Sequence, residues 1–295
     1  MTTTERTAPE ATFDPAAGLT SRRIELAEVT LSVLEAGQGG EPLLLVHGFT
    51  GSKEDFGGEV GRLAALGFHV VAPDHRGHGS SDHPDDEDAY SFETFAADMI
   101  ALAGALEWQT FDVLGHSMGG MIVQHMALTH PHRISRLVLM DTHHGPVADL
   151  DAEILELGIQ LARTQGLEII RDVIKMGRDP LASPAHTRLC AEVPGYEAWC
   201  DAKFLSSSPL MFAAMLRRFH ETADRLDALR QIACPTLVLV GELDTPFLDA
   251  SRRMADAIDT ASLVVVPGGG HSPQLEATDH WREALDSFLL AQRAA

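Results

Sequence analysis

The sequence contains few cysteines and no long apolar run, and each shortage excludes a class of protein. Its three cysteines, Cys190, Cys200 and Cys234, form no Cys-x-x-Cys pair, so neither a disulfide framework nor a zinc site is expected. No run approaches the roughly 18 apolar residues that cross a bilayer, so no membrane partner is predicted. Because residues 1–20 lack a basic segment followed by an apolar one, they are predicted to carry no signal peptide, and a cytoplasmic location is expected.

Positive charge is also scarce. The 295 residues include 22 lysines and arginines against 43 aspartates and glutamates, which gives a formal net charge of −21. A field of this sign repels phosphate backbones and anionic lipid, but it leaves a neutral small molecule unaffected. Nucleic acid is therefore not expected as a partner. The hydrophobic content of 45% is ordinary for a globular protein and provides a sizeable core.

Short continuous apolar runs alternate with helical patterns along most of the chain. Such runs are typical of parallel strands that are buried on both faces. They occupy residues 43–46, 70–72, 113–114, 137–140, 237–240 and 263–266. Two alternating runs between residues 24 and 34 predict an antiparallel pair that opens the domain. Strand alternating with helix predicts an α/β fold with a doubly wound, mostly parallel sheet of about eight strands.

Residues 145–231 interrupt this alternation. They contain no strand-like run, whereas helical periodicity is strong. The segment is too long for a plain loop, so it is predicted to be a helical cap inserted between strands 6 and 7. It would lie over the carboxyl ends of the strands, where open α/β sheets bind ligands. The predicted organisation is a flexible tail over 1–20, a core domain over 21–144 and 232–295, and a cap over 145–231.

A Gly-x-Ser-x-Gly motif, Gly115 to Gly119, lies between an apolar run and a helical pattern. A strand-to-helix turn of this kind strains the backbone of its serine and requires small flanking residues. The turn projects the Ser117 hydroxyl beyond the sheet edge, next to the free N–H groups of a helix N-terminus. Ser117 is therefore predicted to be a nucleophile.

A nucleophilic serine needs a base, and the base needs a carboxylate that fixes its tautomer. His271 and Asp244 each lie just beyond the end of a later apolar run, so both are expected at the same sheet edge as Ser117. Asp141 directly follows another run and is the alternative acid. No carboxylate–histidine pattern with metal-ligand spacing stands out, so neither a metal nor a cofactor is predicted.

The chain resembles the α/β-hydrolase-fold enzymes from about residue 22 to its end. The resemblance rests on five motifs in the family's order: His47-Gly48-Phe49, Asp74 to Ser81, Gly115 to Gly120, Gly241 to Asp244, and Gly270-His271. It implies a catalytic triad of Ser117, Asp244 and His271. It also implies an oxyanion hole formed by the backbone N–H groups of Phe49 and Met118.

Residues beside the predicted triad and within the predicted cap have alternative roles. Some members of the family place their acid where Asp141 stands, but Asp244 is favoured because a proline follows it at the start of the next helix. His116 is expected to point away from the Ser117 hydroxyl, and either to pack or to support the catalytic residues without touching the substrate. Two roles are open for Trp199, Met211 and Met215. They line an apolar substrate pocket, or they form the core of the cap helices.

The resemblance implies a serine hydrolase that cleaves a small, neutral or hydrophobic carboxylic ester or lactone through an acyl-enzyme. Serine at 117 disfavours epoxide hydrolases and haloalkane dehalogenases, which use aspartate there. Ser272 after His271 disfavours the carbon–carbon bond hydrolases, which usually have tryptophan at that position. Carbon–carbon bond hydrolases, enol-lactonases, cofactor-free haloperoxidases or perhydrolases and the menaquinone-pathway lyase stay as alternatives. A non-catalytic ligand-binding member is disfavoured by the intact triad positions. The sequence leaves a homodimer through the cap open.

Overall fold

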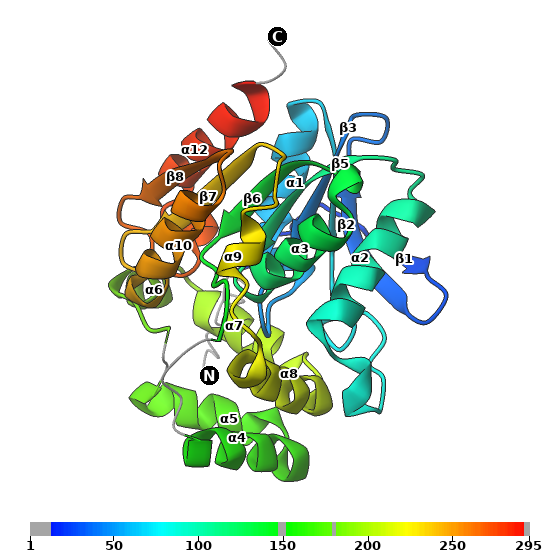
Figure 1. The fold of residues 1–295 in the computed structure, drawn as a ribbon. Helices are drawn as coiled ribbons and strands as arrows, with labels where there is room; N and C mark the ends of the chain where they lie inside the picture. The colour runs from blue at the N-terminus through cyan, green and yellow to red at the C-terminus, as the bar shows by residue number, and fades with distance from the viewer. Residues whose placement is uncertain (1–12, 147–151, 179–180, 292–295) are drawn as a thin grey trace, which may run out of the picture.

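The computed structural model describes residues 13–146, 152–178 and 181–291, which form one mixed sheet flanked by helices and a helical cap (Figure 1). The strands are β1 (Ser21–Glu25), β2 (Thr30–Ala36), β3 (Glu41–Val46), β4 (Phe68–Pro73), β5 (Phe111–His116), β6 (Ile134–Met140), β7 (Thr236–Gly241) and β8 (Ala261–Val266). The helices of the core are α1 (Gly57–Ala65), α2 (Phe92–Ala105), α3 (Met118–Thr129), α10 (Thr245–Ala257), α11 (Pro273–Glu276) and α12 (Thr278–Ala291), with short turns η1 (Lys53–Phe56), η2 (Glu87–Ala89) and η3 (Pro131–Arg133).

The strand order in the sheet is β1-β2-β4-β3-β5-β6-β7-β8. β1 and β2 are antiparallel to their neighbours, and the six strands from β4 to β8 across the sheet are parallel to one another. This arrangement confirms the predicted doubly wound, mostly parallel sheet of eight strands with an antiparallel pair at its start. Because the six strands are parallel, their carboxyl ends meet at a single edge.

The continuous apolar runs fill two cores, one on each face of the sheet. Successive side chains of a strand point to opposite faces. In β3, Leu44 and Val46 therefore pack in the cluster that α2 and α3 cover, whereas Leu43 and Leu45 pack in the cluster that α1 and α12 cover. Both faces are buried, and this is why the strand reads as an unbroken apolar run and not as an alternating one.

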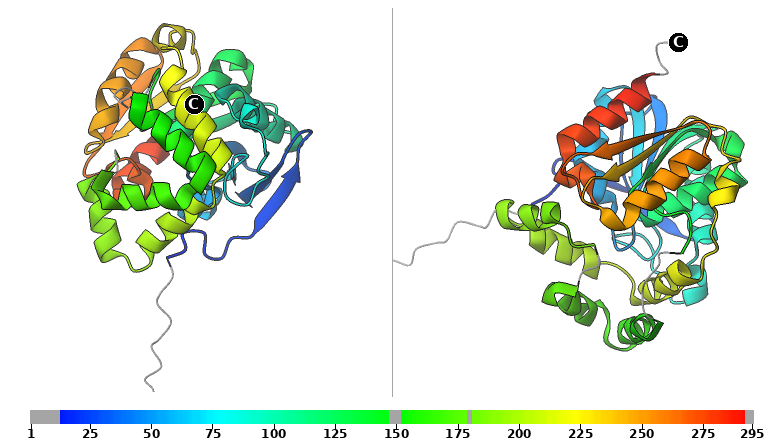
Figure 2. Two further views of the ribbon diagram at one scale, coloured as in Figure 1. Left: turned by 90° about the horizontal axis from the view of Figure 1, so that it is seen from below. Right: turned by 60° about the vertical axis from the view of Figure 1, so that its left-hand side comes forward.

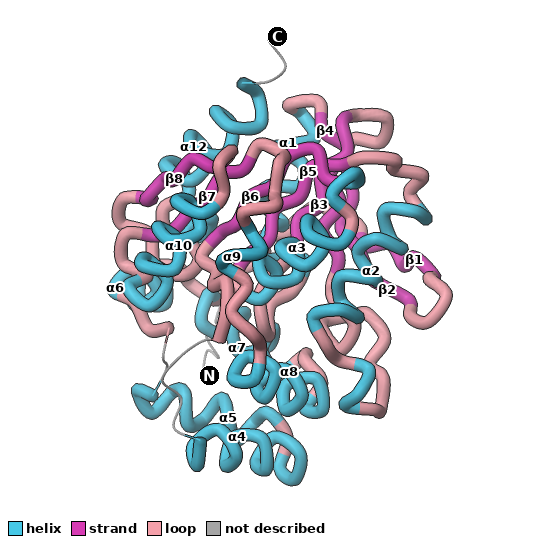
Figure 3. The backbone as a smooth tube through the Cα atoms, in the orientation of Figure 1, coloured by secondary structure: helices cyan, strands magenta, loops and turns pink. Residues whose placement is uncertain are grey.

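Six helical segments lie between β6 and β7, where the sequence predicts the cap. Among the described residues these are, up to Glu221, α4 (Ala152–Gln165), α5 (Leu167–Val173), η4 (Ile174–Arg178), α6 (Pro184–Glu192), α7 (Tyr196–Leu205) and α8 (Pro209–Glu221), and α9 (Leu226–Leu229) makes a seventh before β7. Figures 2 and 3 show α4, α5, α7 and α8 gathered at one end of the sheet. α8 begins in the usual way, because Ser208 accepts a hydrogen bond from the Met211 N–H and Pro209 occupies the first turn.

Ion pairs and aromatic contacts attach the cap to the core. Arg163 of α4 pairs with Glu87, and Lys203 of α7 pairs with Asp55, both at 2.5 Å. The predicted tail over 1–20 lies outside the described residues up to residue 12, and the ring of Phe13 contacts α7. Among the described residues, no helix is both long and apolar enough to cross a membrane.

Candidate active site

Ser117 occupies a sharp turn between β5 and α3. Its φ is +53°, a conformation that costs free energy for any residue with a side chain. Two hydrogen bonds hold the turn, since the Ser117 N–H donates to the Met140 carbonyl at 2.9 Å and the Thr142 hydroxyl donates to the Ser117 carbonyl at 2.6 Å. Gly119 is required by space, because a Cβ there would lie 2.3 Å from the carbonyl oxygen of Val46.

A chain of two hydrogen bonds connects Ser117, His271 and Asp244. The distance between His271 Nε2 and Ser117 Oγ is 2.9 Å, and that between His271 Nδ1 and Asp244 Oδ2 is also 2.9 Å. A carboxylate only accepts, so Nδ1 carries the proton and Nε2 is free to accept from the serine hydroxyl. The three residues come from loops after β5, β7 and β8, at the shared carboxyl edge of the sheet.

The loop that carries His271 is held by Glu276, a residue that the motif analysis missed. The buried Glu276 carboxylate accepts hydrogen bonds from the N–H groups of Gly270 at 2.6 Å and Ser272 at 3.2 Å, on either side of His271. Ser272 is the N-cap of α11, and a glutamate that reaches back to the start of its own helix resembles a capping box. That Ser-Pro-x-x-Glu pattern is the signal in the sequence that could have identified it.

His116 also holds the loop that carries His271. Its Nε2–H donates to the His271 carbonyl at 2.6 Å. Burial, followed by the nearby His271, lowers the pKa of His116 to about 3, so the ring is neutral at physiological pH. Of the two roles expected for His116, this hydrogen bond to the backbone of the histidine loop corresponds to support of the catalytic residues.

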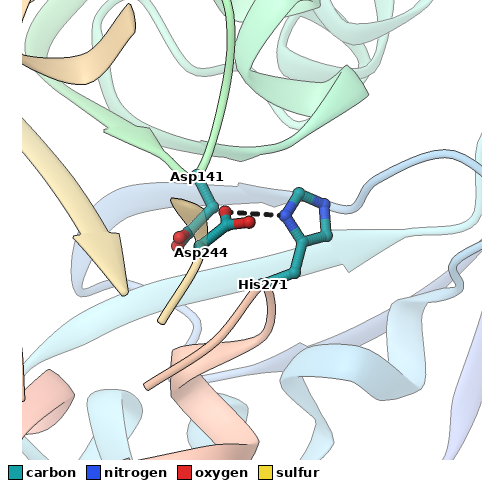
Figure 4. Close-up of side chains that lie close together, drawn as sticks. All are labelled: Asp141, Asp244 and His271. Atoms are coloured by element: carbon teal, nitrogen blue, oxygen red, sulfur yellow. Dashed lines mark hydrogen bonds and ion pairs between the residues drawn. The ribbon is translucent and has the colours of Figure 1, made fainter. Parts of the chain in front are cut away.

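Asp141, the alternative acid, lies beside Asp244 (Figure 4). Its Oδ1 accepts from the Gly241 N–H at 2.8 Å, and among the described residues the hydrogen bond from His271 goes to Asp244. Asp141 is completely buried. Burial, and secondly the charge of Asp244, raise the pKa of Asp141 well above its ordinary value.

The loop that carries Phe49 lies against the Ser117 turn. A Cβ on Gly48 would lie 3.1 Å from the Ser117 Cβ, which shows how closely the two segments approach. Among the described residues, neither the Phe49 nor the Met118 N–H donates a backbone or side-chain hydrogen bond, and that of Met118 is the first of α3. Both N–H groups therefore have no hydrogen-bond acceptor among the described residues.

His47 supports the loop that carries Phe49 through two hydrogen bonds. Its Nδ1–H donates to the Gly48 carbonyl at 2.8 Å, and its Nε2 accepts from the His75 N–H at 3.1 Å. Burial lowers the pKa of His47 well below its ordinary value, so the ring stays in this single neutral tautomer.

One group of side chains among the described residues has donor atoms close enough to hold a metal ion. It consists of Asp141, Asp244 and His271, whose ligand atoms lie within 4.8 Å of one another. The hydrogen bond between His271 and Asp244 already accounts for two of the three residues. The third, Asp141, accepts from a backbone N–H and lies beside Asp244, so the contacts of the group are those of a hydrogen-bonded network.

The residues considered for a substrate pocket lie in two different settings. Met211 and Met215 of α8 are fully buried in the core cluster of α2 and α3. Trp199 of α7 stacks under the Lys203 ammonium, 4.2 Å from its ring centre, and lines a cavity of about 220 Å³ together with Lys53. A further aromatic contact joins the loop after β3 to α8, where Phe49 stacks on Phe212 with ring centres 5.0 Å apart.

The chain belongs to the alpha/beta hydrolase fold family, whose model matches residues 41–278. It is similar to the serine hydrolase BPHL of Homo sapiens, with 30% identity over 96% of this chain and 90% of that protein. Epoxide hydrolase A of Mycobacterium tuberculosis is 27% identical over 92% of this chain and 97% of that protein. A solved thermophilic esterase from Thermogutta terrifontis has a TM-score of 0.76 and 26% identity, over 92% of this chain and 98% of that one. These similarities support a hydrolase that acts on a small molecule.

Proposed function

We propose that the protein is a serine hydrolase that cleaves a small carboxylic ester or lactone through an acyl-enzyme. The observation that carries the proposal is the pair of 2.9 Å hydrogen bonds from Ser117 to His271 and from His271 to Asp244. This arrangement supplies what a serine nucleophile lacks, namely a base within reach and a carboxylate that fixes the tautomer of the base.

In the proposed mechanism, Ser117 Oγ attacks the carbonyl carbon while His271 Nε2 accepts the hydroxyl proton. The N–H groups of Phe49 and Met118 stabilise the negative charge on the carbonyl oxygen, and each such donor is worth about 3 kcal/mol in the transition state. The imidazolium then protonates the leaving alcohol, and the acyl group stays on Ser117. Water, activated by His271 in its turn, hydrolyses the acyl-enzyme and restores the free serine.

The comparisons support ester hydrolysis over epoxide opening. BPHL is named a serine hydrolase and the Thermogutta terrifontis protein an esterase, and both match nearly the whole chain. Epoxide hydrolase A matches as well, but the epoxide hydrolases of this fold use aspartate at the position of Ser117. Phe49 directly follows Gly48, which lies close to the Ser117 Cβ, and its apolar contact with Phe212 favours a neutral or hydrophobic substrate, which also suits the net charge of −21. A cytoplasmic location and a homodimer stay predictions from the sequence.

Turnover of short-chain p-nitrophenyl esters by the wild type and by Ser117→Ala tests the proposal. Because Ser117 would form the covalent bond, we expect the variant to lose on the order of 10⁴-fold or more in kcat. A fluorophosphonate probe should add to the wild type at Ser117, as read by peptide mass spectrometry, and Ser206→Ala, which changes a serine in the cap, should leave both results unchanged. Equal turnover by the wild type and Ser117→Ala would refute the nucleophile, and a panel of lactones and epoxides would define the substrate.

A further inference from the structure

Asp141 is a completely buried carboxyl group with only part of its hydrogen-bonding capacity used. It follows β6, and its Oδ1 accepts from the Gly241 N–H at 2.8 Å. Its other oxygen, Oδ2, is buried without a hydrogen-bond donor among the described residues. An ionised carboxylate placed in this way would bear the full cost of desolvation on one oxygen.

The neighbours of Asp141 make its ionisation still less favourable. The carboxyl group of Asp244 lies beside it (Figure 4), and a ligand oxygen of each residue lies within 4.8 Å of that of the other. The charge of Glu276 from α11 disfavours the ionisation of Asp141 further. The basic group in the cluster, His271, directs its Nδ1–H to Asp244. Two buried carboxyl groups this close hold one proton between them, as in other carboxyl pairs. Since Asp244 receives the bond from His271, the proton belongs on Asp141.

We propose that Asp141 is a positioning residue, which stays protonated at neutral pH and donates a hydrogen bond to the Asp244 carboxylate. Asp244 is then held by two donors, His271 Nδ1–H and the carboxylic acid of Asp141. The proton on Asp141 is not consumed in any step, so its role is to fix the orientation of Asp244. This inference rests on the proposed role of Asp244 as the acid of the triad.

Asparagine is the informative replacement at this position. Its amide oxygen can accept from Gly241, and its amide N–H can donate to Asp244, so Asp141→Asn should keep kcat/KM within about 3-fold of the wild type. Asp141→Ala removes the donor and should lower kcat by about 10-fold or more, with little change in KM. Asp244→Asn should lose on the order of 10⁴-fold, because the tautomer of His271 is no longer fixed. A larger loss in Asp141→Asn than in Asp244→Asn would overturn the proposal.

Two further measurements do not depend on activity. The infrared spectrum of the wild type at neutral pH should contain the carbonyl band of a buried carboxylic acid, and Asp141→Asn should lack it. The melting temperature of Asp141→Asn should exceed that of the wild type by an amount that grows from about pH 4 to about pH 8. The sign follows because the folded wild type keeps a proton that its unfolded state releases.

The exposed Asp256 provides the matched control, since Asp256→Asn should show neither the loss of an infrared band nor a difference in melting temperature that grows with pH. Absence of the acid band in the wild type, or a wild type that gains stability over Asp141→Asn as the pH rises, would overturn the proposal. Both readouts remain decisive if the protein proves not to hydrolyse esters, so failure of this inference is distinguishable from failure of the proposed function.

Discussion

At the scale of single residues, the strained turn at Ser117 depends on atoms that are absent from its neighbours. The Ser117 backbone has a positive φ, and the turn passes so close to β3 that a Cβ on Gly119 would lie 2.3 Å from the Val46 carbonyl oxygen and 2.6 Å from that of His47. Both contacts are with backbone atoms, of a central strand and of the loop that follows it, so neither can shift without a cost in free energy. Gly119 thus allows the turn at Ser117 to pack against the end of β3 and the loop that carries Phe49.

Gly119→Ala should therefore lower the free energy of unfolding by about 1–3 kcal/mol or more, through overpacking against β3 and its following loop. Gly61→Ala is the matched control, because this exposed glycine lies within α1 and a Cβ there meets nothing within 4 Å. That variant should gain about 0.4–1 kcal/mol, as is usual where alanine fits a helix. Urea unfolding of both variants measures the difference, and equal effects of the two substitutions would contradict the steric account.

Which site residues can be predicted from the sequence depends on whether they belong to a motif. Ser117, Asp244 and His271 follow apolar runs and stand in short glycine-rich patterns, and the structure joins them by hydrogen bonds. His116 holds the histidine loop through a backbone carbonyl, and such a contact leaves little trace in a sequence. Glu276 also holds this loop through its backbone, but it stands in a Ser-Pro-x-x-Glu pattern that resembles a capping box and could be read from the sequence.

At the scale of elements, the alternation of apolar runs and helical patterns was enough to predict the fold. Each predicted parallel strand is present. Strands β3 to β7 are buried almost throughout, which explains their unbroken apolar runs. β8 is different, because it is an edge strand and only partly buried, so its apolar run does not reflect burial on both faces. The order of the strands was beyond prediction. β3 lies between β4 and β5 through long-range pairings such as Leu44 with Val71, and local sequence carries no record of such pairings.

The ion pair of Lys203 with Asp55 connects α7 of the cap to η1, which follows the loop that carries Phe49. The two side chains are 18% and 6% exposed, and the Asp55 carboxylate also accepts from the Ser52 N–H at 3.1 Å. Loss of the lysine leaves a largely buried carboxylate without its cation, which is costly. A double-mutant cycle with Lys203→Met and Asp55→Asn should therefore give a coupling energy of about 1–3 kcal/mol in the free energy of unfolding.

The pair of Arg230 with Asp227 is the control for this cycle. It is longer, at 3.7 Å, and its side chains are 61% and 100% exposed. Coupling between exposed charges is weak, so we expect less than about 0.5 kcal/mol there. If both cycles gave the same coupling, the contact of Lys203 with Asp55 would be an ordinary surface pair and would not anchor the cap.

At the scale of the whole molecule, stability should depend on pH through histidines that are buried without charge. Burial lowers the pKa of His47, His75 and His78 well below the ordinary value, and it lowers that of His116 to about 3. His47, His75 and His78 lie together, with ring centres 4.3 to 5.7 Å apart, so a proton on one would disfavour a proton on the next.

The direction of the effect follows from proton uptake. In the unfolded chain these histidines bind protons below about pH 6.5, whereas in the folded protein they do not, so the free energy of unfolding falls as the pH drops below that value. For His116 alone the loss is about 2 kcal/mol at pH 5. The wild type should therefore lose melting temperature relative to His116→Gln between about pH 6.5 and about pH 5, because glutamine does not titrate. This comparison cancels the opposite contribution of the protonated Asp141, which both proteins share. Replacement of the exposed His280 by asparagine should leave the pH dependence of the wild type unchanged. A difference between the wild type and His116→Gln that stays constant over this range would mean that His116 takes up a proton in the folded state as readily as in the unfolded one.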